Sequence, residues 1–277
     1  MKAILFIAAL VVFVATTYSQ TPNAYEVFAI RFVGPWFAPV SEIAVGTDSK
    51  DSVEGCNMIW LLKGYNGRNV LVDAGFLSND STKNDGKHIR PDLALEKTGV
   101  NVDEITDVII THPHNDHIGG IDLFPKAMVW MQKDDFDYFV GTAWQKDGFS
   151  DGFKKIDVRR IIEINLRGKL TLIKGDSLEI IPGIRVFIGS KHTWESQYVL
   201  VNSRTDRVII ASDNIWFYYN LNNLVAIPKY TFDASAYVRA MKRMKTLVSN
   251  VDLIIPGHDE KVFSKFTKIS EGVVKIR

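Results

Sequence analysis

The chain has 277 residues, of which 46% are hydrophobic, so it is long enough to bury one large core, in one domain or two. Its charge is balanced, with 33 Lys and Arg against 32 Asp and Glu, and no run of like charges stands out. Nucleic acids and anionic membranes are therefore poor candidates for partners.

The N-terminal residues have the pattern of a secretory signal peptide. Lys2 precedes an unbroken apolar run, Ala3 to Ala15, and small and polar residues follow it. The run is shorter than the roughly 20 residues that a membrane-spanning helix needs, which disfavours the alternative of an uncleaved anchor. We predict cleavage near Ser19, so that 1–19 is a signal peptide and 20–277 is the mature domain. The protein would then be periplasmic or secreted, without a stable membrane anchor.

Short apolar stretches rich in β-branched residues recur in the first half of the chain, bounded by turn residues. They predict strands over Glu26–Phe32, Asn57–Leu62, Asn69–Val72, Glu104–Ile110 and Ala127–Met131. A helix is expected over Pro91–Lys97. Cys56 is the only cysteine, which excludes an intramolecular disulfide, and its place at the start of an apolar run predicts a buried thiol.

A charged segment over 132–165 carries many aromatic residues, and two interpretations of it stay open. The aromatic positions are Phe136, Tyr138, Phe139, Trp144, Phe149 and Phe153. One interpretation is a pair of surface helices with their apolar stripe turned inward. The other is a lid beside an active site that supplies an apolar wall. Aromatic content alone does not separate packing from recognition.

The second half of the chain returns to strands. They are expected over Leu170–Ile173, Ser177–Ile181, Ile184–Ile188, Tyr198–Asn202, Val208–Ser212 and Val251–Ile255. Between the last two, Phe232–Asn250 has apolar residues at helical spacing, which predicts an amphipathic helix with its methionines in the core. Strands in two blocks with helices outside predict an α+β fold, a two-sheet sandwich flanked by helices.

The run Thr111–Gly120 has a His-x-His-x-Asp-His pattern directly after an expected strand. In extended backbone, residues two apart point the same way, so His112 and His114 can bind one ion. Asp116 and His117 come where the chain turns, and they can face a second ion beside the first. Imidazole and carboxylate suit zinc, and also iron, cobalt or manganese.

Two metals need more ligands than this cluster supplies, and candidates follow the ends of later expected strands. They are His192, Asp213 and His258. A carboxylate there could bridge two cations and hold them roughly 3.5 to 4 Å apart. The sixth histidine, His88, lies in a polar segment, and we expect it to be exposed.

These motifs resemble the metallo-β-lactamase superfamily in their order along nearly all of the mature chain. The matching stretches are Leu71–Gly75, Thr111–Gly120, Gly175–Thr193, Ser212–Asp213 and Pro256–Asp259. The resemblance implies an αββα sandwich with two divalent metal ions, expected to be Zn²⁺, at one edge. It assigns one metal to His112, His114 and His192, and the other to Asp116, His117 and His258. Asp213 would bridge the two metals and Asp73 would orient a ligand.

Within the superfamily, the chain most resembles the N-acyl-homoserine lactonases, the quorum-quenching enzymes. The resemblance implies lactone opening by attack of a metal-bridging hydroxide, with Asp116 passing the proton to the leaving alkoxide. Trp216 stands where those lactonases usually carry a tyrosine that contacts the substrate carbonyl. Tyr218 or Tyr219 is expected to replace that contact if the indole does not. In the lid interpretation, Phe136 and Trp144 would receive the acyl chain.

Other functions stay open at this point. His192-Thr-Trp-Glu195 stands where the family commonly has His-Thr-Pro-Gly, so we expect a reshaped loop with Glu195 near the metals. An exported phosphotriesterase resembling methyl parathion hydrolase, or another ester or lactone hydrolase, would use the same ligands. A metal-stabilised binding protein without turnover is the non-enzymatic alternative. The sequence leaves open the native metal, the acyl-chain preference and the oligomeric state.

Overall fold

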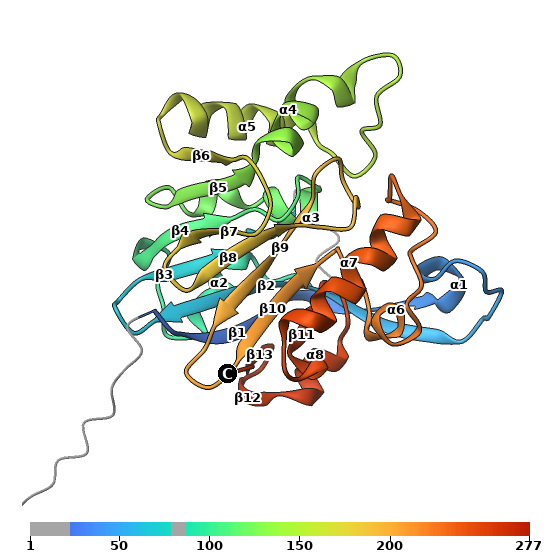
Figure 1. The fold of residues 1–277 in the computed structure, drawn as a ribbon. Helices are drawn as coiled ribbons and strands as arrows, with labels where there is room; N and C mark the ends of the chain where they lie inside the picture. The colour runs from blue at the N-terminus through green and yellow to red at the C-terminus, as the bar shows by residue number, and fades with distance from the viewer. Residues whose placement is uncertain (1–22, 79–86) are drawn as a thin grey trace, which may run out of the picture.

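The computed structural model of the chain describes residues 23–78 and 87–277. The signal peptide predicted over 1–19 lies outside the described residues and stays a prediction. Two β-sheets stack face to face, and helices cover their outer faces (Figure 1). Within the described ranges, no helix combines the length and the apolar character needed to cross a membrane. The αββα sandwich implied by the resemblance is confirmed.

The large sheet has eight strands in the described part of the chain, in the order β12-β13-β1-β2-β3-β4-β5-β6. They are β1 (Tyr25–Pro39), β2 (Ser52–Gly64), β3 (Asn69–Val72), β4 (Ile105–Ile109), β5 (Met128–Gln132), β6 (Leu170–Ile173), β12 (Thr267–Ser270) and β13 (Val273–Lys275). Strands β3 to β6 pair in parallel, so their carboxyl ends reach the same edge.

The small sheet has the order β11-β10-β9-β8-β7. Its strands are β7 (Leu178–Ile181), β8 (Ile184–Ile188), β9 (Gln197–Asn202), β10 (Arg207–Ser212) and β11 (Ile254–Pro256). Strands β10 and β11 are parallel and the other pairs are antiparallel. The carboxyl ends of β10 and β11 therefore lie together.

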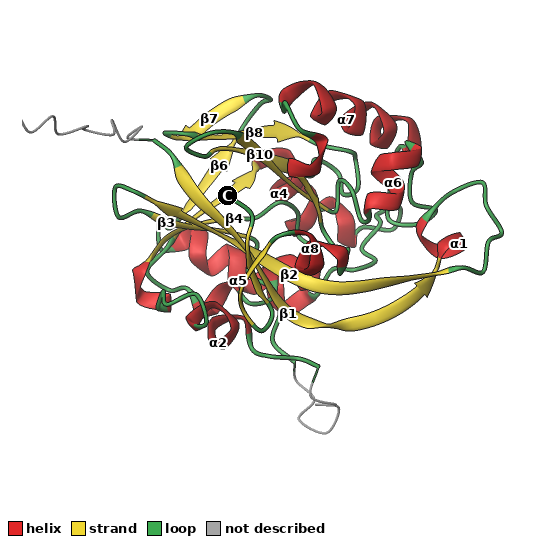
Figure 2. Cartoon of the chain, turned by 90° about the horizontal axis from the view of Figure 1, so that it is seen from below, coloured by secondary structure: helices red, strands yellow, loops and turns green. Residues whose placement is uncertain are grey.

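The helices occupy the connections between strands. The α-helices are α1 (Val40–Ile43), α2 (Pro91–Glu96), α3 (Asn115–Ile118), α4 (Lys133–Val140), α5 (Lys155–Leu166), α6 (Tyr218–Asn223), α7 (Ala234–Leu247) and α8 (Lys261–Lys265). Short 3₁₀ helices cover Val102–Glu104, Ile121–Leu123, Thr142–Trp144 and Val251–Leu253. Figure 2 shows α7 on one side of the stacked sheets and α2 and α5 on the other.

Two apolar cores follow from the alternation of side chains along β1 and β2. Val27 and Trp60 face the small sheet, where they join the core that also buries the α7 methionines. Phe28 and Leu61, one residue along, face the opposite way and pack with α2, α4 and α5. The large sheet is buried on both faces, which explains the nearly continuous apolar runs of its central strands. Cys56 is buried, as predicted.

Strands β1 and β2 continue beyond the sheet as a two-stranded arm that ends at α1 (Figure 2). Strand β1 continues beyond the end expected at Phe32, through Pro35 to Pro39, so the expected strand was too short. Among the described residues, the part of β1 beyond Gly34 pairs with β2 alone, so these prolines have no second neighbour there that needs their missing N–H. Register shifts on either side of Val33 let the arm bend, and they bring Trp36 beside the metal-ligand candidates described below.

Most other boundaries agree with the predictions to within a few residues. The strand expected over Val251–Ile255 is corrected: its first half is a 3₁₀ turn, because the Asn250 side chain accepts a hydrogen bond from the Asp252 backbone N–H. Helix α7 begins after Asp233, whose carboxylate accepts hydrogen bonds from the first turn. The segment 132–165 contains the helix pair of the first interpretation.

Candidate metal centre

The ligand candidates lie together where the two sheets meet at their carboxyl ends. Among the described residues, two groups have the spacing of metal ligands, with ligand atoms within 4.8 Å of one another. The first group is His112, His114, His192 and Asp213, and the second is Asp116, His117 and His258. All seven residues named from the sequence are therefore brought together by four separate segments of the chain.

Distances within the first group fit one tetrahedral ion. His114 Nδ1 lies 3.1 Å from His112 Nε2 and 3.0 Å from His192 Nε2. Asp213 Oδ2 lies 3.2 Å from His192 Nε2 and 3.8 Å from His112 Nε2. Ligand atoms about 2.0 Å from a tetrahedral zinc ion would be roughly 3.3 Å apart, so the four atoms surround a space of the right size.

Asp213 faces both groups. Its Oδ1 lies 3.0 Å from His258 Nε2 and 3.2 Å from His117 Nε2, while Oδ2 faces the first group. Asp116 Oδ2 completes the second group, 3.5 Å from His117 Nε2 and 3.7 Å from His258 Nε2. A carboxylate with one oxygen toward each group has the geometry of a bridging ligand.

Unpartnered atoms support metal binding independently of these distances. His117 Nε2 and Asp213 Oδ1 are buried and have no hydrogen-bond partner. Buried polar atoms are normally paired, and both of these point into the space between ligand candidates. A divalent cation would satisfy both, so the residues present fit the metals.

The electrostatics of the two groups favour cations. Burial lowers the pKa of His112 well below its ordinary value and that of His114 to about 3, so both rings are neutral and can donate a lone pair to a metal. Burial also acts on His117, but the carboxylates of Asp213, Asp116 and Asp73 outweigh it and raise the pKa of that ring. These carboxylates provide the negative field that a cation would neutralise.

Asp73 contacts the ligand candidate His117 on the side away from the metal space. It accepts hydrogen bonds from the Thr111 backbone N–H at 2.8 Å and from the Ser212 hydroxyl at 2.9 Å. Its Oδ2 lies 2.8 Å from His117 Nδ1, which leaves His117 Nε2 to face the metal space. Asp73 and Ser212 have left-handed backbone, with φ of 62° and 47°, so these strand ends turn sharply. This is the orienting contact expected for Asp73.

The loop that carries His192 is fixed from two sides. Asn214, the residue after Asp213, accepts hydrogen bonds from the hydroxyls of Ser190 and Ser196 at 3.0 and 2.9 Å. From the other side, Asp135 of α4 accepts from the Thr193 hydroxyl at 2.7 Å and the Glu195 backbone N–H at 3.1 Å. The loop is held at both of its ends.

A cavity of about 360 Å³ opens onto the two groups. It is lined by Trp36, Asn57, His114, Asp116, Asp151, Gly152, Lys154, Asp213, Trp216, Tyr230 and His258. The Trp216 indole donates to Asp213 Oδ2 at 2.8 Å, and the Asn57 amide donates to Asp116 Oδ2 at 2.8 Å. Trp36 in turn donates to Asn57 at 3.2 Å. The carboxylates of Asp116 and Asp213 are thus each oriented by a neighbouring N–H.

A second cavity of about 490 Å³ adjoins this one, because Asp151 and Tyr230 line both. Its other lining residues are Phe149, Pro228, Lys229, Thr231 and Phe232. Phe149 and Phe232 are 42% and 40% exposed and their rings contact each other, so they give this cavity a partly exposed apolar wall.

The substrate contacts predicted from the sequence are only partly found here. Trp216 lines the cavity, but Tyr218 and Tyr219 do not, and Tyr218 lines a separate cavity. Phe136 is buried in the core and Trp144 packs against that core, donating its indole N–H to a backbone carbonyl. Neither lines the two cavities described above, because both side chains pack against the core under the large sheet.

Two further expectations are corrected. Glu195 forms an ion pair with Lys191 and belongs to neither ligand group. His88 is half-buried, not exposed, because its ring packs against Phe76 and Phe32 with centroids 5.0 and 6.2 Å away. The sequence marks neither contact, since each depends on how loops fold over the sheet.

Sequence reasoning missed several lining residues. Trp36 and Asn57 lie on the arm, and Asp151, Gly152 and Tyr230 lie on loops. Gly152, with φ of 80°, lets the chain pass the His114 ring, and glycine after aspartate in a loop was the one available signal.

Comparisons with known proteins agree with this geometry. The model of the metallo-beta-lactamase superfamily matches residues 53–258. An N-acyl homoserine lactonase from a Bacillus species is 24% identical over 60% of this chain and 60% of its own length. N-acyl homoserine lactonase AiiB of Agrobacterium fabrum is 22% identical over 64% of this chain and 65% of its own. The matched regions thus span less than two thirds of these relatives.

Solved structures share the fold over more of the chain. A quorum-quenching N-acyl homoserine lactone lactonase superposes with a TM-score of 0.69 at 20% identity, covering 91% of this chain and 99% of the other. AidC, a dizinc quorum-quenching lactonase in complex with a product, superposes with a TM-score of 0.64 at 14% identity, covering 87% and 92%. At such identities the likeness establishes the fold alone.

Proposed function

The chain belongs to the metallo-beta-lactamase superfamily of hydrolases, and from this premise we propose that it opens the lactone ring of N-acyl-homoserine lactones, with two zinc ions as cofactor. The observation that carries the proposal is the position of Asp213, which lines an open cavity. One of its carboxylate oxygens faces the first ligand group and the other faces the second. Curated relatives with lactonase names and solved lactonases of the same fold support the substrate class.

The metals would be held by the two groups already described. One ion would lie among His112, His114 and His192, the other among Asp116, His117 and His258, with Asp213 between them. When bound, such a pair of ions supplies a nucleophilic water at neutral pH and polarises the carbonyl under attack. The chain's own contribution is to orient the ligands, shape the cavity and move a proton.

Asp116 is placed to move that proton. Its side chain is 30% exposed and lines the cavity, so it can reach both the metal space and a bound substrate. Asn57 donates to Oδ2, which leaves Oδ1 free to take a proton and deliver it to the alkoxide of the opened ring. Trp36, which donates to Asn57, fixes the amide in this orientation.

Trp216 would position the bridging carboxylate. Its indole N–H bonds to Asp213 at 2.8 Å, and the Tyr237 hydroxyl accepts from its backbone N–H at 3.1 Å. The ring stands over His258 at a centroid distance of 5.7 Å and forms one wall of the cavity. In this chain the residue acts on a ligand of the metals, and it also limits the room for the substrate.

The acyl chain would enter the second cavity. Phe149 and Phe232 offer partly exposed rings there, and their centroids lie 5.7 Å apart. Because this cavity meets the metal cavity at Asp151 and Tyr230, a lactone over the metals would place its amide near that junction. Apolar pockets with a few polar groups at one end suit ligands of this kind. Segment 132–165 would thus contribute Phe149 to the acyl-chain site, in place of the contacts expected from Phe136 and Trp144.

The test uses the mature chain, expressed from Gln20. Elemental analysis should give about two metals per chain, and proton release should follow addition of acyl-homoserine lactones. Replacing Phe149→Ala should raise KM for long-chain substrates while leaving short-chain substrates unchanged. Phe37→Ala is the matched control, because Phe37 is 70% exposed on the arm and lines neither cavity.

Each result has one meaning for the proposal. Two metals without ring opening, together with hydrolysis of paraoxon, would replace the lactonase with a phosphotriesterase that uses the same ligands. If neither the lactone nor paraoxon is hydrolysed, a metal-stabilised binding protein would be favoured. Absence of metal after supplementation would refute the metal centre. The signal peptide predicted over 1–19 would place the activity outside the cytoplasm, which fractionation of expressing cells tests separately.

A further inference from the structure

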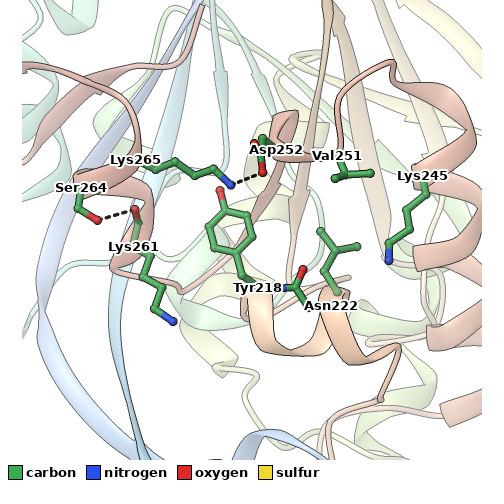
Figure 3. Close-up of a pocket in the computed structure, with 9 residues that line it drawn as sticks. Tyr218, Asn222, Lys245, Val251, Asp252, Lys261, Ser264 and Lys265 are labelled. Carbon is green, nitrogen blue, oxygen red and sulfur yellow. Dashed lines mark hydrogen bonds and ion pairs between the residues drawn. The ribbon is translucent and has the colours of Figure 1, made fainter.

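A third cavity, of about 320 Å³, lies apart from the metal centre (Figure 3). It is lined by Tyr218, Leu221, Asn222, Lys245, Val251, Asp252, Lys261, Ser264 and Lys265. These residues come from α6, α7, α8 and the 3₁₀ turn before β11. None of them lines the cavity that opens onto the metal ligands. Four separate segments therefore enclose a space with no part in the proposed hydrolysis.

Positive charge dominates this cavity. Three lysines line it against a single carboxylate, Asp252, which pairs with Lys265 at 2.6 Å. Within the described chain, Lys245 and Lys261 form no ion pair, and Figure 3 shows them on opposite sides of the cavity. Two ammonium groups that form no ion pair and line one hollow attract an anion more strongly there than on a flat surface, and the nearby Asp259 carboxylate offsets only part of the charge of Lys261.

A buried hydroxyl points to a ligand independently of the lysines. Tyr218 is 7% exposed, and its hydroxyl has no hydrogen-bond partner. Burial raises the pKa of this phenol above its ordinary value, so the group is a neutral donor. The hydroxyl is directed toward the end of the cavity where Lys265 and Asp252 meet (Figure 3). Buried hydroxyls are normally paired, and an oxygen of a bound anion would supply the missing acceptor.

We propose that this cavity is a binding site for a small organic phosphate, separate from the metal centre. Lys245 and Lys261 would contact the phosphate oxygens, as ammonium groups do in other phosphate sites. The Tyr218 hydroxyl would donate to the same group. Leu221 and Val251 form an apolar wall beside them, which suits the carbon part of the ligand better than a bare ion.

The site is joined to the metal centre through one residue. Asp259, directly after His258, accepts hydrogen bonds from the backbone N–H of Tyr218 at 2.9 Å and of Lys261 at 3.0 Å. The backbone of both cavity residues is thereby tied to the segment that carries a metal-ligand candidate.

The experiment is a calorimetric titration of the metal-loaded mature chain with phenylphosphonate, a phosphate analogue that resists hydrolysis, and with inorganic phosphate. Phenylphosphonate should bind more tightly than inorganic phosphate, and its binding should weaken as salt rises. Lys245→Gln and Lys261→Gln should each weaken binding about tenfold or more, since each removes a charge-assisted hydrogen bond. Tyr218→Phe should weaken it severalfold.

The matched control is Lys242→Gln, because Lys242 is an exposed lysine of α7 that does not line the cavity. Binding that survives unchanged in both lysine variants would place the anion elsewhere, including at the metals, and would overturn the site. Equal affinity for the two probes would contradict the preference for an organic phosphate over a bare ion. Full affinity in the Tyr218 variant would exclude the hydroxyl as a donor to the ligand. Absence of binding in the natural chain would refute the proposal outright.

Discussion

Asp135 gives the sharpest test of the structure, because its effect on stability has a definite sign. The carboxyl lies buried on α4, where it holds Thr193 and Glu195 beside His192. Burial, stronger than the hydrogen bonds that it accepts, raises its pKa from 3.8 to about 7. The perturbation is Asp135→Asn, which keeps the shape and replaces the protonated acid with an amide.

The magnitude follows from linkage. Because the native pKa lies above the unfolded one, native Asp135 keeps its proton between about pH 4 and pH 7 while the unfolded chain has released it. The free energy of unfolding therefore falls as pH rises through this range. A pKa change from 3.8 to about 7 corresponds to a loss of up to about 4 kcal/mol. Below about pH 4 this contribution to stability is fully present, and above pH 7 the loss is complete.

The assay is urea unfolding, followed by tryptophan fluorescence, of the natural chain and Asp135→Asn from pH 4.5 to 8. The natural chain should lose stability relative to the variant as pH rises, since contributions of other groups cancel in the difference. Asp134→Asn, at an exposed position on the same helix, is the matched control and should parallel the natural chain. Parallel curves for Asp135→Asn would show that the carboxyl is not buried as described, and would refute the reasoning.

Two further substitutions test the metal centre. Gly152→Ala would place a Cβ 2.6 Å from the His114 ring, at a φ of 80°, so metal content and activity should both fall, as elemental analysis and lactone assays measure. Gly99→Ala has the same φ with nothing within 4 Å and should keep its metals; equal losses in the two would mean that backbone strain alone is responsible. Trp216→Phe removes the donor to Asp213 and should lower kcat about tenfold to a hundredfold with metal content retained. An unchanged kcat would mean that the indole lines the cavity without positioning Asp213.

The ligand candidates could be predicted because their signal is local. His112, His114, Asp116 and His117 occupy one run directly after a strand, where spacing alone sets which side chains point together. The apolar runs also gave most strands nearly to the residue, as in Asn69–Val72. Each of these depends on a few neighbouring residues, so the sequence carries the information.

The pairing of strands could not be predicted in the same way. Strand β1 pairs with β13 from the far end of the chain, and β10 pairs in parallel with β11 across the α6 and α7 connection. Such contacts depend on the whole fold, and periodicity in one segment does not encode its partner. The two-sheet architecture was available only through the resemblance to a known family. Strands β12 and β13 were missed, since four- and three-residue strands carry little pattern.

The cavity wall was the least predictable part, for a physical reason. Phe136 and Phe149 are both aromatic residues of one segment, yet the first is buried in the core and the second is 42% exposed on the wall. What separates them is that α4 turns its apolar stripe onto the sheet, while the loop after it passes over the site. Composition cannot report that difference, because an apolar ring suits either place.

Trp216 shows why a departure from a family pattern still has to be located in space. From the sequence alone, the tryptophan at the position where lactonases usually carry a tyrosine was expected to change a contact to the substrate carbonyl. In the structure the indole N–H is already engaged by Asp213 at 2.8 Å. The donor therefore acts on the Asp213 carboxylate, and under the proposed function the substrate would find its contacts on Tyr230 and the rings of the second cavity. Under the proposed function, the ligand set would specify the hydrolytic chemistry, while the arm and loops that sequence reasoning missed would decide which ester or lactone is accepted.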